Sequence, residues 1–119
     1  MVSIEKLIYH FNQSLRVNDH ILMMLKEPIR IRVELEQNLL YLTLDRKRLL
    51  IKHARPLKNY HINIQTTADH FHSLLQGRTS LKKQVDEKHI ILKSTFRQLL
   101  KLDAIFLLNQ NLSKIYQMY

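Results

Sequence analysis

Two neighbouring segments in which apolar and polar residues alternate strictly constrain the fold of this chain more than any other feature. In Ile29–Leu35 the four aliphatic residues point to one side and the charged residues to the other. After a turn at 36–38, the apolar side continues with Leu40, Leu42 and Leu44. A period of two is typical of an antiparallel sheet with one buried and one solvated face. The chain is therefore predicted to contain a sheet whose apolar face needs a covering layer.

Other periodic segments predict that layer and the rest of the sheet. Three more segments have the composition of strands, namely 48–55, 61–65 and 88–93. Apolar residues at helical spacing predict helices over 4–15, 66–76, 79–85 and from residue 96 onward. The expected fold is α+β: a five-stranded, mostly antiparallel sheet with helices packed on one face. The chain is expected to be a single domain, 1–119, because it is only 119 residues long.

Capping residues mark where the helices begin and end. Thr66 precedes Asp69 by three residues, which is the spacing of a capping box. Thr95 and Gln98 repeat that spacing at the start of the last helix. Gly77, the only glycine in the chain, is predicted to end the helix at 66–76 in the left-handed conformation.

A further short helix is predicted between residues 18 and 27. Asn18 or Asp19 is a suitable cap, and Pro28 ends the helix because the residue before a proline leaves the helical region. Met23 and Met24 are expected to fill the core, with a ligand-facing surface as the alternative.

Composition excludes several classes of protein. No apolar run reaches the length of a membrane span, and the start has no apolar block typical of a signal peptide. The chain has no cysteine, so disulfides, thiol catalysis and thiolate metal sites are excluded. The ending Tyr-Gln-Met-Tyr is not the peroxisomal address Ser-Lys-Leu. We therefore expect a cytoplasmic protein of a bacterium.

The sequence offers no catalytic or metal-binding pattern. A nucleophile elbow, a phosphate loop and a dinucleotide fingerprint are absent, and the carboxylates are scattered singly. The seven histidines lack the His-Glu-x-x-His spacing, and His70 and His72 point in different directions on their helix. We therefore expect no enzyme activity, no catalytic residue, no metal site and no cofactor.

Two short motifs connect the chain to a known family. They are Thr-Thr-Ala-Asp-His-Phe at 66–71 and Leu-Leu-Gln-Gly-Arg-Thr-Ser at 74–80. In these motifs, and in the order of elements from Ile4 to Leu108, the chain resembles the sterol carrier protein 2 family of lipid-binding domains. Family members usually carry glycines before the last strand and the last helix, where this chain has Asp86-Glu87 and Ser94-Thr95. The resemblance implies an apolar tunnel between sheet and helices, with the last helix as its lid.

Non-catalytic binding, or transfer, of a hydrophobic or amphipathic lipid is the first hypothesis. The ligand would be a fatty acyl chain, a phospholipid or an isoprenoid, and its apolar area would be buried in the tunnel. The predicted wall combines apolar residues of the sheet and of the helices: Ile31, Val33, Leu42, Leu44, Ile62, Phe71, Leu75, Phe96, Leu100 and Phe106.

A second hypothesis makes the same fold an interaction or scaffold module with a filled core. The last helix is apolar around most of its girth, which indicates either deep burial or a second apolar partner. Core packing with a homodimer contact, a lid over a lipid cavity and a helix on a membrane surface all fit this pattern. Asp103 lies among these leucines and is expected to find solvent or a cation.

The net charge of +9 predicts an anionic partner, and the strongest bias lies between Arg46 and Lys58. This basic segment has no acid and six basic residues: Arg46, Lys47, Arg48, Lys52, Arg55 and Lys58. A solvated face, an anionic membrane or acidic protein partner, and a nucleic acid are the three interpretations. The absence of helix-turn-helix, zinc-finger and RNP-type patterns argues against nucleic acid. In the lipid-binding hypothesis, basic residues at the tunnel mouth would hold an anionic head group.

Overall fold

A five-stranded sheet forms one layer of the molecule. The computed structural model describes residues 3–16, 23 and 25–117 of the chain. Its strands are β1 (Ile29–Glu34), β2 (Leu39–Asp45), β3 (Leu49–His53), β4 (Ile62–Gln65) and β5 (Ile91–Ser94). They lie in the order β3-β2-β1-β4-β5, and only the β1–β4 pair is parallel. The predicted α+β fold with a mostly antiparallel sheet is confirmed.

The strict alternation in the sequence fixes which face of the sheet is buried. Ile31 of β1 pairs with Leu42 of β2 on one side and with Ile62 of β4 on the other. All three side chains are at most 2% exposed. Because alternate residues of a strand share a face, this row and its neighbours two residues away form a continuous apolar surface across the central strands.

The opposite face of the sheet is polar and solvated. Arg32 of β1 forms an ion pair with Glu34 and donates a hydrogen bond to Asn63 Oδ1 of β4 at 3.0 Å. A hydrogen bond with Tyr41 of β2 raises the pKa of Arg32. These contacts join the polar side chains of β1, β2 and β4 on the wet face that the alternation predicts.

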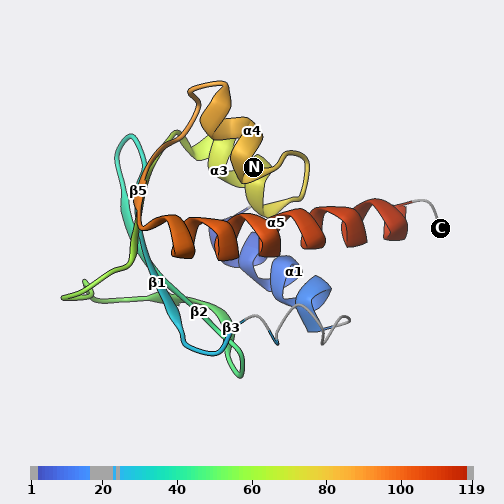
Figure 1. Ribbon diagram of the computed structural model, residues 1–119, viewed down its shortest axis with the longest axis horizontal. Coiled ribbons are helices and arrows are strands. Elements are labelled where there is room, and N and C mark those ends of the chain that lie inside the picture. The colour runs from blue at the N-terminus through green and yellow to red at the C-terminus, as the bar shows by residue number, and fades with distance from the viewer. Residues whose placement is uncertain (1–2, 17–22, 24, 118–119) are drawn as a thin grey trace.

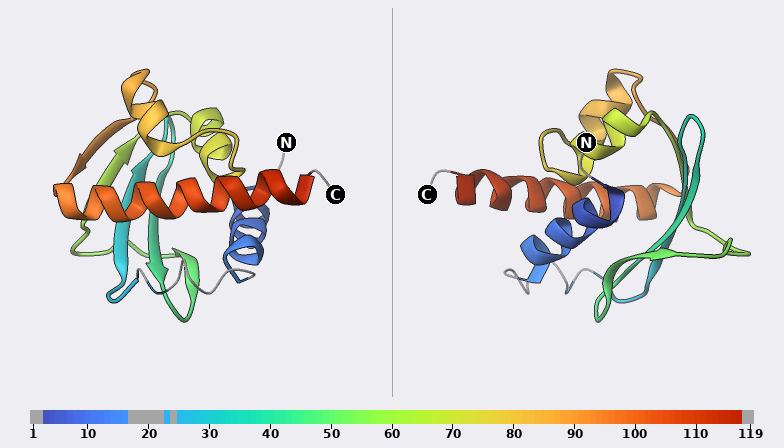
Figure 2. Two further views of the ribbon diagram at one scale, coloured as in Figure 1. Left: turned by 45° about the vertical axis from the view of Figure 1, so that its right-hand side comes forward. Right: turned by 180° about the vertical axis from the view of Figure 1, so that it is seen from behind.

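The helices cover only the apolar face (Figure 1). They are α1 (Ile4–Arg16), α3 (Ala68–Leu75), α4 (Leu81–Asp86) and α5 (Phe96–Gln117). Helix α5 runs across the strands in front of the sheet, as the left view of Figure 2 shows. Helices α1 and α5 meet through Phe11 and Phe106, whose ring centroids are 5.4 Å apart.

The start of α3 differs from the prediction by one residue. Thr67, and not Thr66, is the N-cap, because its hydroxyl accepts the hydrogen bond from His70 N. The Thr66 hydroxyl donates instead to His89 O at 2.8 Å and is buried. The predicted capping box of Thr66 and Asp69 is therefore wrong: a contact distant in sequence takes up the hydroxyl that the local pattern offered.

Two helices end in the same left-handed turn. Gly77 has φ 74°, Gly77 N donates to Leu74 O, and Arg78 N donates to Ser73 O, which together form a Schellman motif. The predicted role of Gly77 is confirmed. After α4 the same pair of hydrogen bonds recurs around Lys88, which has φ 65° although it is not a glycine. This lysine occupies the turn before the last strand.

Other boundaries also shift. Strand β5 starts at Ile91 and not at Lys88, because the left-handed turn uses residues 88 and 89. Strand β3 is shorter than 48–55 and ends at His53. Met23 is 62% exposed, so its prediction as core filler is wrong. Met24 and most of the predicted helix at 18–27 lie outside the described residues.

The Schellman turn at Gly77 can be tested by substitution. Gly77→Val should lower the free energy of unfolding by at least about 1 kcal/mol, because a β-branched residue resists positive φ. The measurement is the urea midpoint. Gln76→Val is the matched control, since Gln76 has φ −77° and stays right-handed. Equal midpoints for Gly77→Val and the parent protein would contradict the turn.

Candidate functional site

Eight of the ten predicted wall residues belong to one packed core. They are at most 4% exposed, and the group consists of Ile31, Val33, Leu42, Leu44, Ile62, Phe71, Leu75 and Phe106. The structure thus brings together residues from β1, β2, β4, α3 and α5, as predicted. Whether any of them touches a ligand stays a prediction.

The most deeply buried residues of this core leave no space beside them in the described structure. Val33, Leu44 and Ile62 have 0% exposed surface, so no water-sized space adjoins them. Leu102 and Ile105 of α5 are likewise 0% exposed. A lipid in contact with these residues would therefore have to displace the side chains that now surround them.

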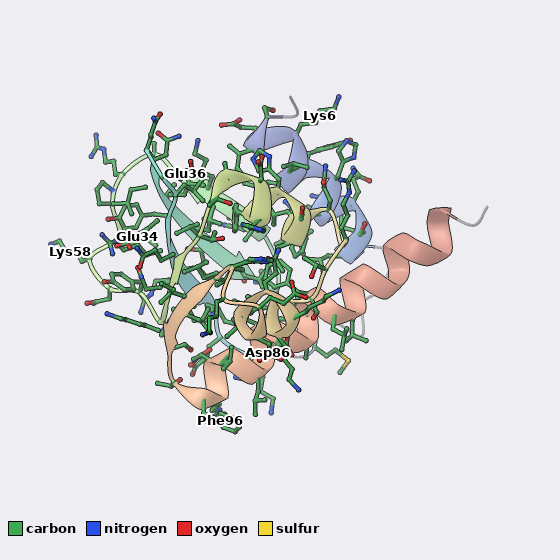
Figure 3. All side chains as sticks on the ribbon, turned by 90° about the horizontal axis from the view of Figure 1, so that it is seen from above. Lys6, Glu34, Glu36, Lys58, Asp86 and Phe96 are labelled. Atoms are coloured by element: carbon green, nitrogen blue, oxygen red, sulfur yellow. The ribbon has the colours of Figure 1, made fainter. Side chains whose placement is uncertain are left out.

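The other two predicted wall residues lie outside this core. Phe96 and Leu100 of α5 are 75% and 53% exposed. Phe96 projects from the edge of the molecule at the start of α5, as Figure 3 shows. Both residues line a groove between α4 and α5 with a volume of about 510 Å³, which falls in the range of small-molecule sites. We call it the α4–α5 groove.

The floor of the α4–α5 groove connects with the core. Val85 of α4 and Leu99 of α5 line the groove, and both also pack against the core cluster. Apolar side chains are thus continuous from the exposed Phe96 and Leu100 through the floor to the interior. A ligand in the groove would contact apolar surface along its length.

Three charged residues border the same groove: Lys82, Asp86 and Asp103. Asp103 Oδ1 accepts a hydrogen bond from Lys82 N at 3.0 Å, near the start of α4. This contact joins α4 to α5, because the carboxylate satisfies one of the free N–H groups of a helix N-terminus. Asp103 was expected to find solvent or a cation; its side chain is half-buried and reaches solvent, and it also accepts a hydrogen bond from a backbone N–H group.

The sequence did not predict a site role for four residues that line the groove: Lys82, Val85, Asp86 and Leu99. The helical spacing of the apolar residues does indicate that α5 has two apolar sides. Leu102, Ile105 and Phe106 form a stripe at i, i+3 and i+4 that faces the core, whereas Phe96 and Leu100 lie on another side. The contribution of α4 has no such signal, since it depends on how two helices distant in sequence meet.

The basic segment does not gather at the α4–α5 groove. Arg46, Lys47 and Arg48 are exposed in the turn between β2 and β3. Lys52 lies on β3 and binds Glu5 Oε1 of α1 at 3.0 Å, which lowers the pKa of Glu5. Arg55 and Lys58 are exposed in the loop before β4. No member of the segment lines the groove, and its predicted membrane contact stays a prediction.

Two of the seven histidines, His70 and His89, form a stack. The rings of His70 and His89 lie parallel with centroids 4.1 Å apart. His70 Nδ1 contacts Thr67 Oγ1 at 2.8 Å, and His89 Nδ1 lies 3.4 Å from Glu87 Oε2. Among the residues that the structure describes, no three histidines or carboxylates come close enough together to hold a metal ion.

Comparisons with solved structures identify the fold. A ubiquinone synthesis protein, UbiJ-SCP2, has a TM-score of 0.65 and 13% identity over 93% of this chain and 98% of that one. Palmitated SCP2L2 from Aedes aegypti has a TM-score of 0.60 and 10% identity over 88% of this chain and 95% of that one. Sterol carrier protein 2 from Yarrowia lipolytica has a TM-score of 0.55 and 17% identity over 87% of this chain and 85% of that one. The chain has the sterol carrier protein 2 fold.

Sequence comparisons add nothing to this result, since no family model and no curated protein matches the chain. Helices long and apolar enough to cross a membrane are also absent from the described part of the chain. The resemblance found in the sequence is therefore confirmed at the level of the fold.

The two sides of α5 should respond differently to truncation. Phe106→Ala should lower the free energy of unfolding by about 3–5 kcal/mol, because it leaves a cavity beside Phe11. Leu100→Ala should cost less than about 1 kcal/mol, because Leu100 is largely exposed. Urea midpoints check both values. A small loss for Phe106→Ala would show that the interior under α5 is loosely filled.

Proposed function

We propose that this protein binds an amphipathic lipid without catalysing a reaction, and that the lipid chain enters at the α4–α5 groove. The single observation that carries the proposal is this groove: an apolar hollow of about 510 Å³ that is continuous with the core. The fold supports it, since one protein of the same fold has been solved in a palmitated form.

The groove is suited to an extended hydrocarbon chain. Phe96 and Leu100 are exposed to water on its sides, and covering them would remove apolar surface from solvent at about 25 cal/mol per Å². The partly buried Val85 and Leu99 would meet the chain from below. A longer ligand would reach the eight predicted wall residues in the core only if α5 moved away from the sheet.

The charged residues at the rim of the groove would determine which lipid head groups it accepts. Lys82 provides one positive charge, whereas Asp86 and Asp103 provide two negative charges. Asp103 is held by the backbone of α4, so Lys82 and Asp86 are the groups free to turn toward a ligand among those lining the groove. We expect neutral and zwitterionic head groups to be accepted as well as a carboxylate.

A fluorescent fatty acid and the corresponding fatty alcohol test the site directly. Both probes should bind the parent protein, and Leu100→Gln should weaken each at least about tenfold, because a polar side chain would replace apolar wall. Leu107→Gln is the matched control: Leu107 lies on the same helix, is 44% exposed and does not line the groove. Absence of probe binding, or equal weakening by both substitutions, would contradict the site.

A second function is favoured by the packed interior. The 0% exposure of Val33, Leu44 and Ile62 is what a filled interaction module would show, and Leu107 and Leu108 remain exposed for a partner. Native mass spectrometry before and after lipid extraction separates the two functions. A mass increment that disappears on extraction supports the lipid carrier, whereas a dimer without lipid supports the interaction module.

A further inference from the structure

Among residues 3–16, 23 and 25–108, the most exposed large apolar side chain lies at the start of α5. Phe96 is 75% exposed, and Leu100 stands one helical turn further on at 53%. Together they form an apolar ridge along one wall of the α4–α5 groove, which we call the Phe96 ridge. Large apolar side chains that are next to each other and exposed indicate a surface that is covered by a partner.

Basic residues flank the Phe96 ridge in the sequence and across the groove. Lys93 precedes Phe96 by three residues and Arg97 follows it, and both side chains are exposed. Lys82 lies across the groove, and Lys101 follows Leu100. Asp86 and Asp103 are the acids that line the same groove, so two acids stand against the four basic residues Lys82, Lys93, Arg97 and Lys101.

Charge decides between the candidate partners of this surface. A second copy would bring an equally positive ridge, and a chain with a net charge of +9 would repel it. An anionic bilayer is attracted by the same charges, and its acyl-chain region can take up the apolar side chains of the ridge. An apolar strip bordered by lysine and arginine is the arrangement found where helices lie in a membrane interface.

We propose that the Phe96 ridge docks on the surface of an anionic lipid bilayer, with Phe96 inserted and Lys93 and Arg97 on the head groups. This inference rests on the proposed function and deepens it. The ridge forms one wall of the groove, so docking would place the groove opening against the lipids. A chain could then pass between bilayer and groove without crossing water.

The test uses a property of the sequence: the chain has no tryptophan. Phe96→Trp supplies a single reporter at the ridge, and Leu39→Trp supplies a matched one at the start of β2, where Leu39 is 44% exposed. With vesicles of phosphatidylcholine and phosphatidylglycerol, the emission of Phe96→Trp should shift to the blue and be quenched by brominated lipid. The emission of Leu39→Trp should not change.

Cosedimentation with the same vesicles measures the contributions of the ridge and of its charges. Phe96→Ala should lower the partition coefficient at least about tenfold, because the inserted ring is lost. Replacing Lys93 and Arg97 with glutamine should lower it about fivefold for each residue, and the effect should fade at high salt. Glutamine at Arg46 and Lys47 is the charge-matched comparison, and a smaller loss there than at Lys93 and Arg97 would assign the membrane contact to the ridge and not to the basic segment.

Several results would overturn the proposal. They are an absence of vesicle binding, equal losses for the ridge and the control variants, and binding to a single-stranded oligonucleotide that the ridge variants abolish. A dimer that Phe96→Ala dissociates would also overturn it. Titration of the fluorescent fatty acid without vesicles separates a failure of membrane docking from a failure of the proposed lipid site. In that titration, the variant with glutamine at 93 and 97 should bind the fatty acid as tightly as the parent protein does.

Discussion

The packing of α5 on the sheet and on α1, where Phe106 meets Phe11, positions the candidate site. These rings join the first and last helices of the described chain at a centroid distance of 5.4 Å. Alternation along β1 and β2 creates an apolar surface that must be covered, and α5 crosses it to do so (Figure 2). Asp103 then attaches α4 to the same helix through Lys82 N.

The two sides of α5 therefore have separate roles. The inner stripe with Leu102, Ile105 and Phe106 fills the core, while Phe96 and Leu100 remain in solvent beside α4. A helix that covers the core and also exposes apolar side chains lowers the solubility of the protein. The net charge of +9 offsets that loss of solubility. This division locates the proposed lipid site at the edge of the core and relates it to the proposed membrane contact.

Local patterns predicted most of the fold, because alternation and capping act between neighbouring residues. The strand periods and Gly77 are examples, and the four aliphatic residues of Ile29–Leu35 gave the sheet its buried face. Predictions went wrong where a contact distant in sequence decided the outcome. The Thr66 hydroxyl binds His89 O, so Thr67 begins α3. For the same reason the ten predicted wall residues fall in two places, eight in the core and two in the groove, because the groove forms only where α4 meets α5.

Methyl NMR spectra of the protein with a spin-labelled fatty acid would test the central claim most directly. The methyl signals of Val85, Leu99 and Leu100 should broaden first, because these residues line the α4–α5 groove. The signals of Leu42 and Leu44 should broaden later or not at all, because these residues are at most 1% exposed. Broadening confined to Leu42 and Leu44, or to no methyl group, would contradict a lipid site at the groove.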